Sequence, residues 1–381
     1  MIAALHKRSR QLDLLTALVV MAVLVLAFLL GRRASLLWPG LLLAGISGAV
    51  LLARPALGLP ALILAALVVP LEFGTGTEVS LNAATLLVPA MLVVWLLAMI
   101  VRGRLHAVRS RLNRPLLLFL GASVLSLLIG IATWDPMVPR SSNFLLVQLA
   151  QWAIFAFSAG ALWLTANLAT GETWLRRMTW VFLVLGGGVA IGRQLPGLGS
   201  VMERVSTIAF VRAPFWALLA SLAGGQLLFN RSLRRPARWG LVAVLASAFV
   251  YAFVQQQEAA SNWVGLGVAL AVLFWLRFPR LRWPVIAVVL VLAVLGILVP
   301  SVYEFAGGDE EWVLSGSSRL VLIERVLEVT MRNPITGLGP AGYRPYANME
   351  PLAYQRAYWL QPSVNSHNNY VDLFAHGGIV G

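Results

Sequence analysis

One histidine, at the junction between a long loop and a helix, has the residue type and position that suit proton transfer. His367 follows Ser366 and precedes Asn368 and Asn369. The amino end of a helix carries partial positive charge and favours the neutral imidazole, which is the form that a general base must have. A histidine in this position could equally cap the helix or lie in a membrane interface, and the spacing alone leaves both interpretations open.

Four arginines beside apolar runs could bind phosphate groups. Arg193, Arg204 and Arg212 flank or enter two of these runs, and Arg319 begins a segment with helical periodicity. A guanidinium group matches phosphate oxygens in a bidentate arrangement. A charge at membrane depth costs roughly 2.5–3.5 kcal/mol, so such residues tend to be paired or functional. The alternative for each arginine is contact with lipid headgroups, or an exposed ion pair of little energetic value.

Two other patterns are weak indications of a site. The segment Gly337–Gly342 fits the dinucleotide-binding spacing, but no strand precedes it and Pro340 interrupts any helix start. We expect a turn there, whose amides could face an anion. Asp372 and His376 share a helical face, but two ligands at this spacing are weak evidence for a metal. We therefore expect a structural pair, with no metal and no cofactor.

The elements that must position these residues are membrane-spanning helices. The chain has 381 residues, of which 59% are apolar and 12% are charged, whereas about a quarter of an average soluble domain is charged. It contains no cysteine, which excludes disulfides, thiolate metal sites and cysteine nucleophiles. The composition excludes an ordinary cytosolic enzyme and predicts an all-α, polytopic transmembrane bundle.

Eleven runs are apolar and long enough to span a bilayer, which requires roughly 20 residues. They cover residues 13–30, 35–53, 56–71, 82–101, 115–133, 144–168, 178–195, 208–229, 239–254, 261–276 and 284–302. We therefore expect a transmembrane bundle over residues 1–302 and one large, partly helical periplasmic loop over 303–367. Residues 368–381 would begin a twelfth transmembrane helix, which we expect to be truncated.

The distribution of basic residues predicts which helix ends face the cytoplasm. With the amino terminus inside, the inner segments carry 18 of the 29 basic residues and two of the 15 acidic ones. An excess of Lys and Arg marks cytoplasmic loops. The net charge of +14 is thus a topology signal and an attraction to anionic membrane lipids. A nucleic-acid partner is not needed to explain it.

Helical periodicity predicts a surface helix within the large loop. It would begin at Ser317 or Ser318, end at Asn333 before Pro334, and lie along the outer membrane surface. One face would hold Leu320, Ile323, Leu327 and Met331, and another would hold Arg325 and Glu328. Tyr343 and four other aromatic residues after this helix could stack on sugar rings or equally form an interfacial belt.

Short motifs near the carboxyl end occur in a specific order. Ser318-Arg319-Leu320 precedes Asn333-Pro334-Ile335-Thr336-Gly337-Leu338-Gly339, and His367-Asn368-Asn369-Tyr370-Val371 precedes Gly378-Ile379-Val380-Gly381. Together they resemble the O-antigen ligase and polymerase family of bacterial envelope glycosyltransferases. In that family an arginine-led helix, a Pro-x-x-Gly-x-Gly turn, a His-Asn helix and a glycine exit follow one another. The many-spanning topology extends the resemblance over the chain.

Some positions depart from the family pattern. Arg204-Val205-Ser206 is similar to the family's arginine segment before the eighth span, but the continuation Val211–Pro214 replaces a stretch rich in asparagine and proline. Asn262 stands where many members have an arginine, and His376 stands where a glutamate is common. These differences concern mainly the donor side of the implied site.

The resemblance implies an inverting, metal-independent glycosyl transfer at the periplasmic face of the bacterial inner membrane. The donor would be a glycan on undecaprenyl diphosphate, and the acceptor a hydroxyl of lipid A core or a similar lipid or glycan. His367 would be the catalytic base. Arg204 and Arg319, with Arg212 as a weaker third, would bind the diphosphate. The residues that could support the site are Gly337, Gly339, Tyr343 and Asn368.

Three alternatives remain open. A polymerase of the same family would use the same donor with another acceptor. A transporter or flippase for a lipid-linked sugar would more often show repeat symmetry and broken, charged helices at mid-membrane. Here the interior spans lack acidic residues and the charges gather at the outer edge, which favours an outward-facing enzyme. A purely structural envelope subunit would leave the large loop unexplained.

Overall fold

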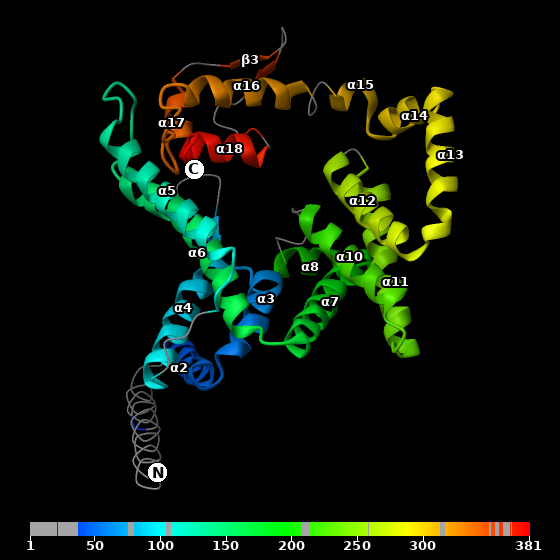
Figure 1. Cartoon of the computed structure of the whole chain (residues 1–381), viewed down its shortest axis with the longest axis horizontal. Helices are drawn as coiled ribbons and strands as arrows, with labels where there is room; N and C mark the ends of the chain where they lie inside the picture. Colours follow the sequence, from blue (N-terminus) through cyan, green and yellow to red (C-terminus); the bar gives the residue numbers. More distant parts are fainter. Residues whose placement is uncertain are drawn as a thin grey trace.

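The chain forms a helical bundle with a layer of shorter helices across one end (Figure 1). The computed structural model describes residue 21 and residues 37–74, 80–103, 108–206, 213–257, 259–312, 317–349, 352–354, 358–360, 366 and 368–381. The all-α polytopic class expected from the composition is confirmed. The first expected span, residues 13–30, lies outside the described residues apart from Met21.

A helix coincides with each of the ten expected spans between residues 35 and 302. These helices are α2 (Leu37–Ala53), α3 (Gly58–Val68), α4 (Ala83–Val101), α5 (Asn113–Ala132), α6 (Phe144–Leu168), α7 (Glu172–Gln194), α10 (Ala213–Phe229), α11 (Arg235–Val250), α12 (Ala260–Arg277) and α13 (Arg282–Val294). Among the described residues, six helices are individually long and apolar enough to cross a membrane: α4 to α7, α11 with its π-helical extension η2 (Tyr251–Gln255), and α12.

Two sharp bends interrupt the apolar helices, one between the second and third expected spans and one within the span expected over 284–302. The helices α2 and α3 meet at 120° around a short 3-10 turn, η1 (Pro55–Leu57). The run over 284–302 breaks between α13 and α14 (Leu298–Phe305), which meet at 85°. Gly296 has a φ of +70° there, and the Ile297 N–H donates to the Leu292 carbonyl. This is the Schellman arrangement that ends a helix at a glycine.

The part of the chain after α14 forms the layer across the end of the bundle. It consists of α15 (Gly308–Glu311), α16 (Ser318–Thr330), α17 (Tyr343–Ala347), the antiparallel pair β3 (Leu352–Tyr354) and β4 (Tyr358–Leu360), and α18 (Asn369–Gly377). A second hairpin, β1 (Glu72–Gly74) with β2 (Ser80–Asn82), precedes α4. In Figure 1, α16 runs above α18, and both lie beside the end of α5.

The surface helix predicted after Ser317 exists, but it ends earlier than predicted. It ends at Thr330 instead of Asn333, and Ser317 is its N-cap residue without a capping side-chain bond. Leu320 and Met331, on the face predicted to be apolar, are 62% and 64% exposed, whereas Arg325 is only 7% exposed. The periodicity correctly predicted that these apolar residues share one face. The residues that pack against the protein are others, among them Leu322, Val326 and Val329. An exposed apolar stripe suits contact with lipid.

The predicted orientation can be tested by cysteine labelling, since the chain has no native cysteine. We expect Arg109→Cys and Arg234→Cys to be protected from a membrane-impermeant reagent in intact cells, because both lie in basic segments predicted to be cytoplasmic. Glu310→Cys and Tyr354→Cys should be labelled. Labelling of Arg109→Cys without permeabilisation would contradict the orientation.

Candidate functional site

The turn after α16 and the end of α18 interlock through their backbones. The Leu338 N–H donates to the Ala375 carbonyl at 2.9 Å, and the Ile379 N–H donates to the Pro334 carbonyl at 3.0 Å. Gly337 and Gly378 have φ values of +70° and +63°. A side chain at Gly337 would lie 2.5 Å from the His376 carbonyl oxygen, and one at Gly378 would overlap the Ile335 carbonyl group. Both positions therefore require glycine.

This interlocked unit docks on the ends of α5 and α6. Gly130 of α5 has no side chain, and a Cβ there would lie 2.7 Å from the Leu338 carbonyl oxygen. The Ser126 hydroxyl donates to the His376 carbonyl. On α6, the fully buried Gln148 accepts a hydrogen bond from the Ala341 N–H at 2.8 Å. We call α16, the turn over 331–342, α17, α18 and these two helix ends the outer platform.

An aromatic cluster fills the centre of the outer platform. The Trp134 ring lies 4.3 Å from that of Phe144 and 4.8 Å from that of Tyr346. The Tyr346 hydroxyl accepts a hydrogen bond from the Asp135 N–H at 2.9 Å. The Arg332 guanidinium lies over the Tyr346 ring, 5.5 Å from its centroid. The link between α5 and α6 is thereby held against α17.

Tyr343 and Arg325 belong to the interior of the platform. Tyr343 is 4% exposed, and burial raises the pKa of its phenol to about 12 in spite of the nearby Arg325 guanidinium. Arg325 donates to the Glu328 carboxylate at 2.9 Å and to the Ala347 carbonyl at 3.4 Å. It therefore ties α16 to α17. A buried Tyr343 supports the turn from within, and its ring is not available to stack on a sugar.

A network of short hydrogen bonds holds the residues on both sides of His367. The Ser366 hydroxyl donates to the Asp372 carboxylate at 2.7 Å, and the Ser366 N–H donates to the same oxygen at 3.1 Å. Asn368 is the N-cap of α18, and its Oδ1 accepts from the Tyr370 N–H at 3.0 Å. His367 itself lies outside the described residues. The described residues on either side of it are Ser366, which is hydrogen-bonded to Asp372, and Asn368, which is the N-cap of α18.

The arginines proposed for phosphate binding lie on two separate helices. Arg319 is exposed near the start of α16, which packs with α17 and α18. Arg204 is exposed near the end of α8 (Gly199–Val205), which packs against α7. In Figure 1, α8 and α16 lie apart. Arg212 lies outside the described residues. The described structure does not bring Arg204 and Arg319 together.

Arg193 lies in a polar cluster at the end of α7. Its guanidinium stacks over the Tyr251 ring, 4.6 Å from the centroid, and Tyr251 in turn stacks on Trp216 at 4.1 Å. Gln194 accepts a hydrogen bond from Gln255 at 2.9 Å. Tyr251 and Gln255 both belong to η2, a π-helical turn of the kind that often marks functional sites. The cluster links α7, α10 and α11.

The described residues contain no group of three or more acidic or histidine side chains placed to hold a metal ion. Asp372, whose partner was expected to be His376, instead accepts both hydrogen bonds from Ser366. The His376 ring points elsewhere, with Nδ1 3.4 Å from the Gly339 carbonyl oxygen and the ring edge near Phe155. Within the described structure, Asp372 and His376 therefore do not pair with each other through a hydrogen bond. Asp372 contacts Ser366, and His376 contacts Gly339 and Phe155.

Several residues that shape the platform were not candidates from the sequence. Gln148 lies in the sixth apolar run, which also contains Gln151 and Asn167, and nothing in the sequence distinguishes the amide that contacts the turn from the other two. Arg325 was placed only on a different helix face from the apolar stripe, and its burial was not expected. Asp372 was expected to pair with His376. Its observed partner is Ser366, six positions earlier in the sequence.

The described chain is thus a multi-pass helical membrane protein whose motif segments gather in one docked platform. A model of the O-antigen ligase family matches residues 257–381, which include α12 to α18. These residues carry the similarity to the O-antigen ligase family that the motifs predicted, and the resemblance is confirmed there. No curated protein and no solved structure shows a significant match to the chain.

Proposed function

We propose that the protein transfers a glycan from undecaprenyl diphosphate to an acceptor hydroxyl at the periplasmic face of the bacterial inner membrane. The family match over residues 257–381 supports a glycosyltransferase of the O-antigen ligase or polymerase type. The observation that carries the proposal is the interlock of the Pro-x-x-Gly-x-Gly turn with the glycine exit of α18. It joins the segments that carry these two motifs into one hydrogen-bonded unit, which also contains the start of α18.

His367 is the base in this proposal. The acceptor hydroxyl attacks the anomeric carbon while its proton passes to the neutral imidazole. The bond between the anomeric carbon and the diphosphate oxygen breaks, and undecaprenyl diphosphate leaves with the electron pair. Direct displacement inverts the configuration at the sugar. Support comes from the hydrogen bonds of Ser366 and Asn368, which anchor both neighbours of His367 at a helix amino end.

Arginines offset the charge on the leaving diphosphate. Fixed cations can stabilise a developing anion when they are aimed at it in advance. Arg319 is exposed on the platform itself and is the strongest member of the set. Arg204 lies on α8, which packs against α7, and would have to move toward Arg319 to share one diphosphate with it. Arg212 lies outside the described residues and stays a prediction from the sequence. Gly337, Gly339, Tyr343 and Asn368 act by shaping the platform, since the contacts described above give each a structural role.

Ligase and polymerase activities share the donor and differ in the acceptor. Purified protein, incubated with a labelled undecaprenyl-diphosphate glycan, would be offered lipid A core in one reaction and only further donor in another. Label on lipid A core identifies a ligase, and lengthening of the donor glycan identifies a polymerase. Absence of transfer to either acceptor class, with the donor bound, would contradict the proposal.

Arg319→Ala should lower turnover by about 10²–10³-fold, the range seen when one preorganised donor to a developing anion is removed. Arg319→Lys should recover only part of the loss, because lysine supplies charge without the planar fork. Turnover and donor affinity would be measured on purified variants. Arg140→Ala removes another exposed outward arginine and should leave both unchanged. Unchanged affinity and turnover in Arg319→Ala would remove this residue from the diphosphate site.

A further inference from the structure

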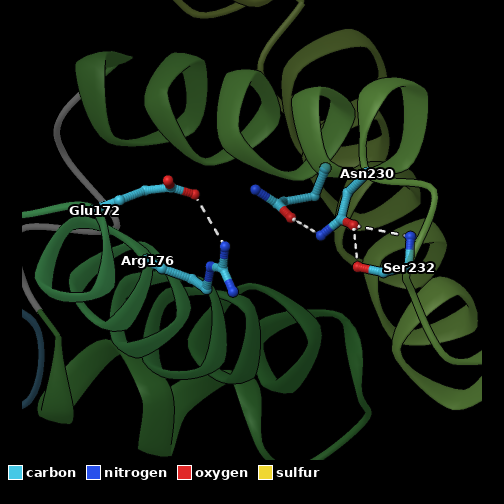
Figure 2. Close-up of polar contacts among 5 residues, drawn as sticks. Glu172, Arg176, Asn230 and Ser232 are labelled. Carbon is cyan, nitrogen blue, oxygen red and sulfur yellow. Dashed lines mark hydrogen bonds and ion pairs between the residues drawn. The ribbon is translucent and has the colours of Figure 1, made fainter.

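A cavity of about 690 Å³ lies between α7, α10 and α11, at the opposite end of α7 from Arg193. It is formed by the start of α7, the end of α10 and the start of α11. Figure 2 shows Glu172 and Arg176 on one side of the view and Asn230 and Ser232 on the other. The charge distribution predicts that this end of the bundle faces the cytoplasm. The cavity is therefore separate from the outer platform.

Polar side chains of the cavity are positioned by contacts with one another. Arg176 and Glu172 form an ion pair at 2.9 Å, and both side chains are mostly exposed. A guanidinium has five N–H donors, so this pairing leaves Arg176 able to bind another anion. The Asn230 Oδ1 accepts from the Ser232 hydroxyl at 2.7 Å and the Ser232 N–H at 3.1 Å. These bonds hold the turn that leads to Arg234, which also lines the cavity.

The electrostatic field at the cavity favours an anion. The segments 171–177 and 230–238 contain six arginines and one carboxylate. Both α7 and α11 begin here. The N-cap of α7 is Gly171, which has no side chain, and the side chain of Arg234, the N-cap of α11, makes no capping bond. Their first backbone N–H groups and their partial positive charge add to the field of the arginines. Glu172 is the only acidic side chain that lines the described cavity.

Apart from Thr179 and Gln226, the other side chains that line the cavity are apolar, which indicates an amphiphile as the occupant. The apolar residues that line it are Leu175, Trp180, Phe229, Leu233 and Ala237. A free inorganic phosphate would gain nothing from these side chains, whereas the glycerol and upper acyl carbons of a lipid would be buried against them. Basic pockets between transmembrane helices on the cytoplasmic side are suited to anionic lipid headgroups.

We propose that this cavity binds the phosphodiester headgroup of an acidic membrane phospholipid. Arg176 and Arg234 bind the phosphate, Asn230 and Ser232 shape the polar rim, and the apolar wall accepts the adjoining part of the lipid. The site joins the inner ends of three helices whose other ends form the Arg193 cluster. It is independent of the proposed glycosyl transfer, because none of its residues belongs to the outer platform.

The test measures lipid binding to the purified full-length protein in neutral detergent. Phosphatidylglycerol, phosphatidylcholine and inorganic phosphate would be titrated separately, with bound lipid counted by native mass spectrometry. We expect phosphatidylglycerol to bind and the other two to bind weakly or not at all. Arg176→Gln combined with Arg234→Gln should weaken binding by about 25-fold, since each basic side chain near a lipid surface contributes about fivefold.

Two control variants separate the cavity from general attraction to a basic surface. Arg109→Gln with Arg280→Gln removes the same charge from other exposed inner segments and should leave binding of phosphatidylglycerol within about twofold. Ala237→Trp fills the cavity without changing charge and should reduce binding as the double arginine variant does. Equal losses in both arginine pairs, or equal binding of inorganic phosphate and phosphatidylglycerol, would overturn the proposal. Glycosyl transfer, measured in parallel, reports on the outer site alone.

Discussion

His367→Ala is expected to lower turnover by about 10²–10⁴-fold while donor binding is retained. The acceptor hydroxyl is a poor nucleophile, and a positioned general base contributes about this factor. Histidine suits the role because its ordinary pKa lies near neutrality. Turnover would be measured with saturating donor over a range of pH, with donor binding measured separately on the same preparation.

The control for this variant is His106→Ala, which removes a histidine from a segment predicted to be cytoplasmic. It should show the turnover of the unmodified protein. If His367→Ala also retained near-normal turnover at every pH, His367 would be a helix-cap neighbour only and another group would have to accept the proton. Glu203, an exposed carboxylate on α8, is the next residue to test.

Gly378→Ala is expected to disrupt the outer platform and to lower turnover by roughly 10- to 100-fold. Its φ of +63° and ψ of −156° lie in a region that is essentially restricted to glycine, and another residue there costs of order 1–3 kcal/mol. The added Cβ also overlaps the Ile335 carbonyl group. A loss of 1.4 kcal/mol is a factor of ten in an equilibrium or a rate. The thermal midpoint in detergent should fall along with turnover.

The neighbouring Gly377→Ala provides a matched control. A Cβ at Gly377 meets no atom within 4 Å, and the residue is helical. This variant should keep both the thermal midpoint and the turnover. If Gly378→Ala behaved as Gly377→Ala does in both measurements, the interlock of the turn with α18 would not hold the platform together.

The positions of the helices could be predicted because a bilayer requires apolar segments of a set length. All ten described spans coincide with helices on that basis. The bends could not be predicted from hydropathy. The hydropathy of residues 284–302 depends only on which residues are present, and it does not report the direction in which the helix axis runs. The break occurs because Gly296 has a positive φ and because the Leu292 carbonyl accepts the hydrogen bond of the Ile297 N–H, which ends the helix. Glycine within an apolar run is common in membrane helices, so its presence alone does not indicate a break.

The helix α16 shows a second feature that the sequence pattern did not predict, namely which of its faces is buried. Periodicity correctly grouped Leu320 with Met331, but a helix that touches both lipid and protein has two surfaces that accept apolar residues. Arg325 is buried because the Ala347 carbonyl and the Glu328 carboxylate receive its N–H groups. The carbonyl comes from another helix, and no local pattern in α16 indicates it.

The candidate site was likewise predicted only in part. Motif order led to the turn and the start of α18 as parts of one site, and the structure joins the turn to the last turn of the same helix through Leu338 and Ala375. The Ser126, Gly130 and Gln148 contacts that dock this unit on the bundle are made between segments far apart in the sequence. Such contacts depend on how α5 and α6 are placed, which single-sequence patterns do not encode.

The most direct test of the central claim is a transfer assay with purified protein in lipid vesicles, a labelled glycan on undecaprenyl diphosphate and a lipid or glycan acceptor. We predict that label appears on the acceptor and that undecaprenyl diphosphate is released in equal amount, without added nucleotide and in the presence of a metal chelator. Movement of intact labelled donor between the two leaflets, with no label on any acceptor, would contradict the account and identify a transporter.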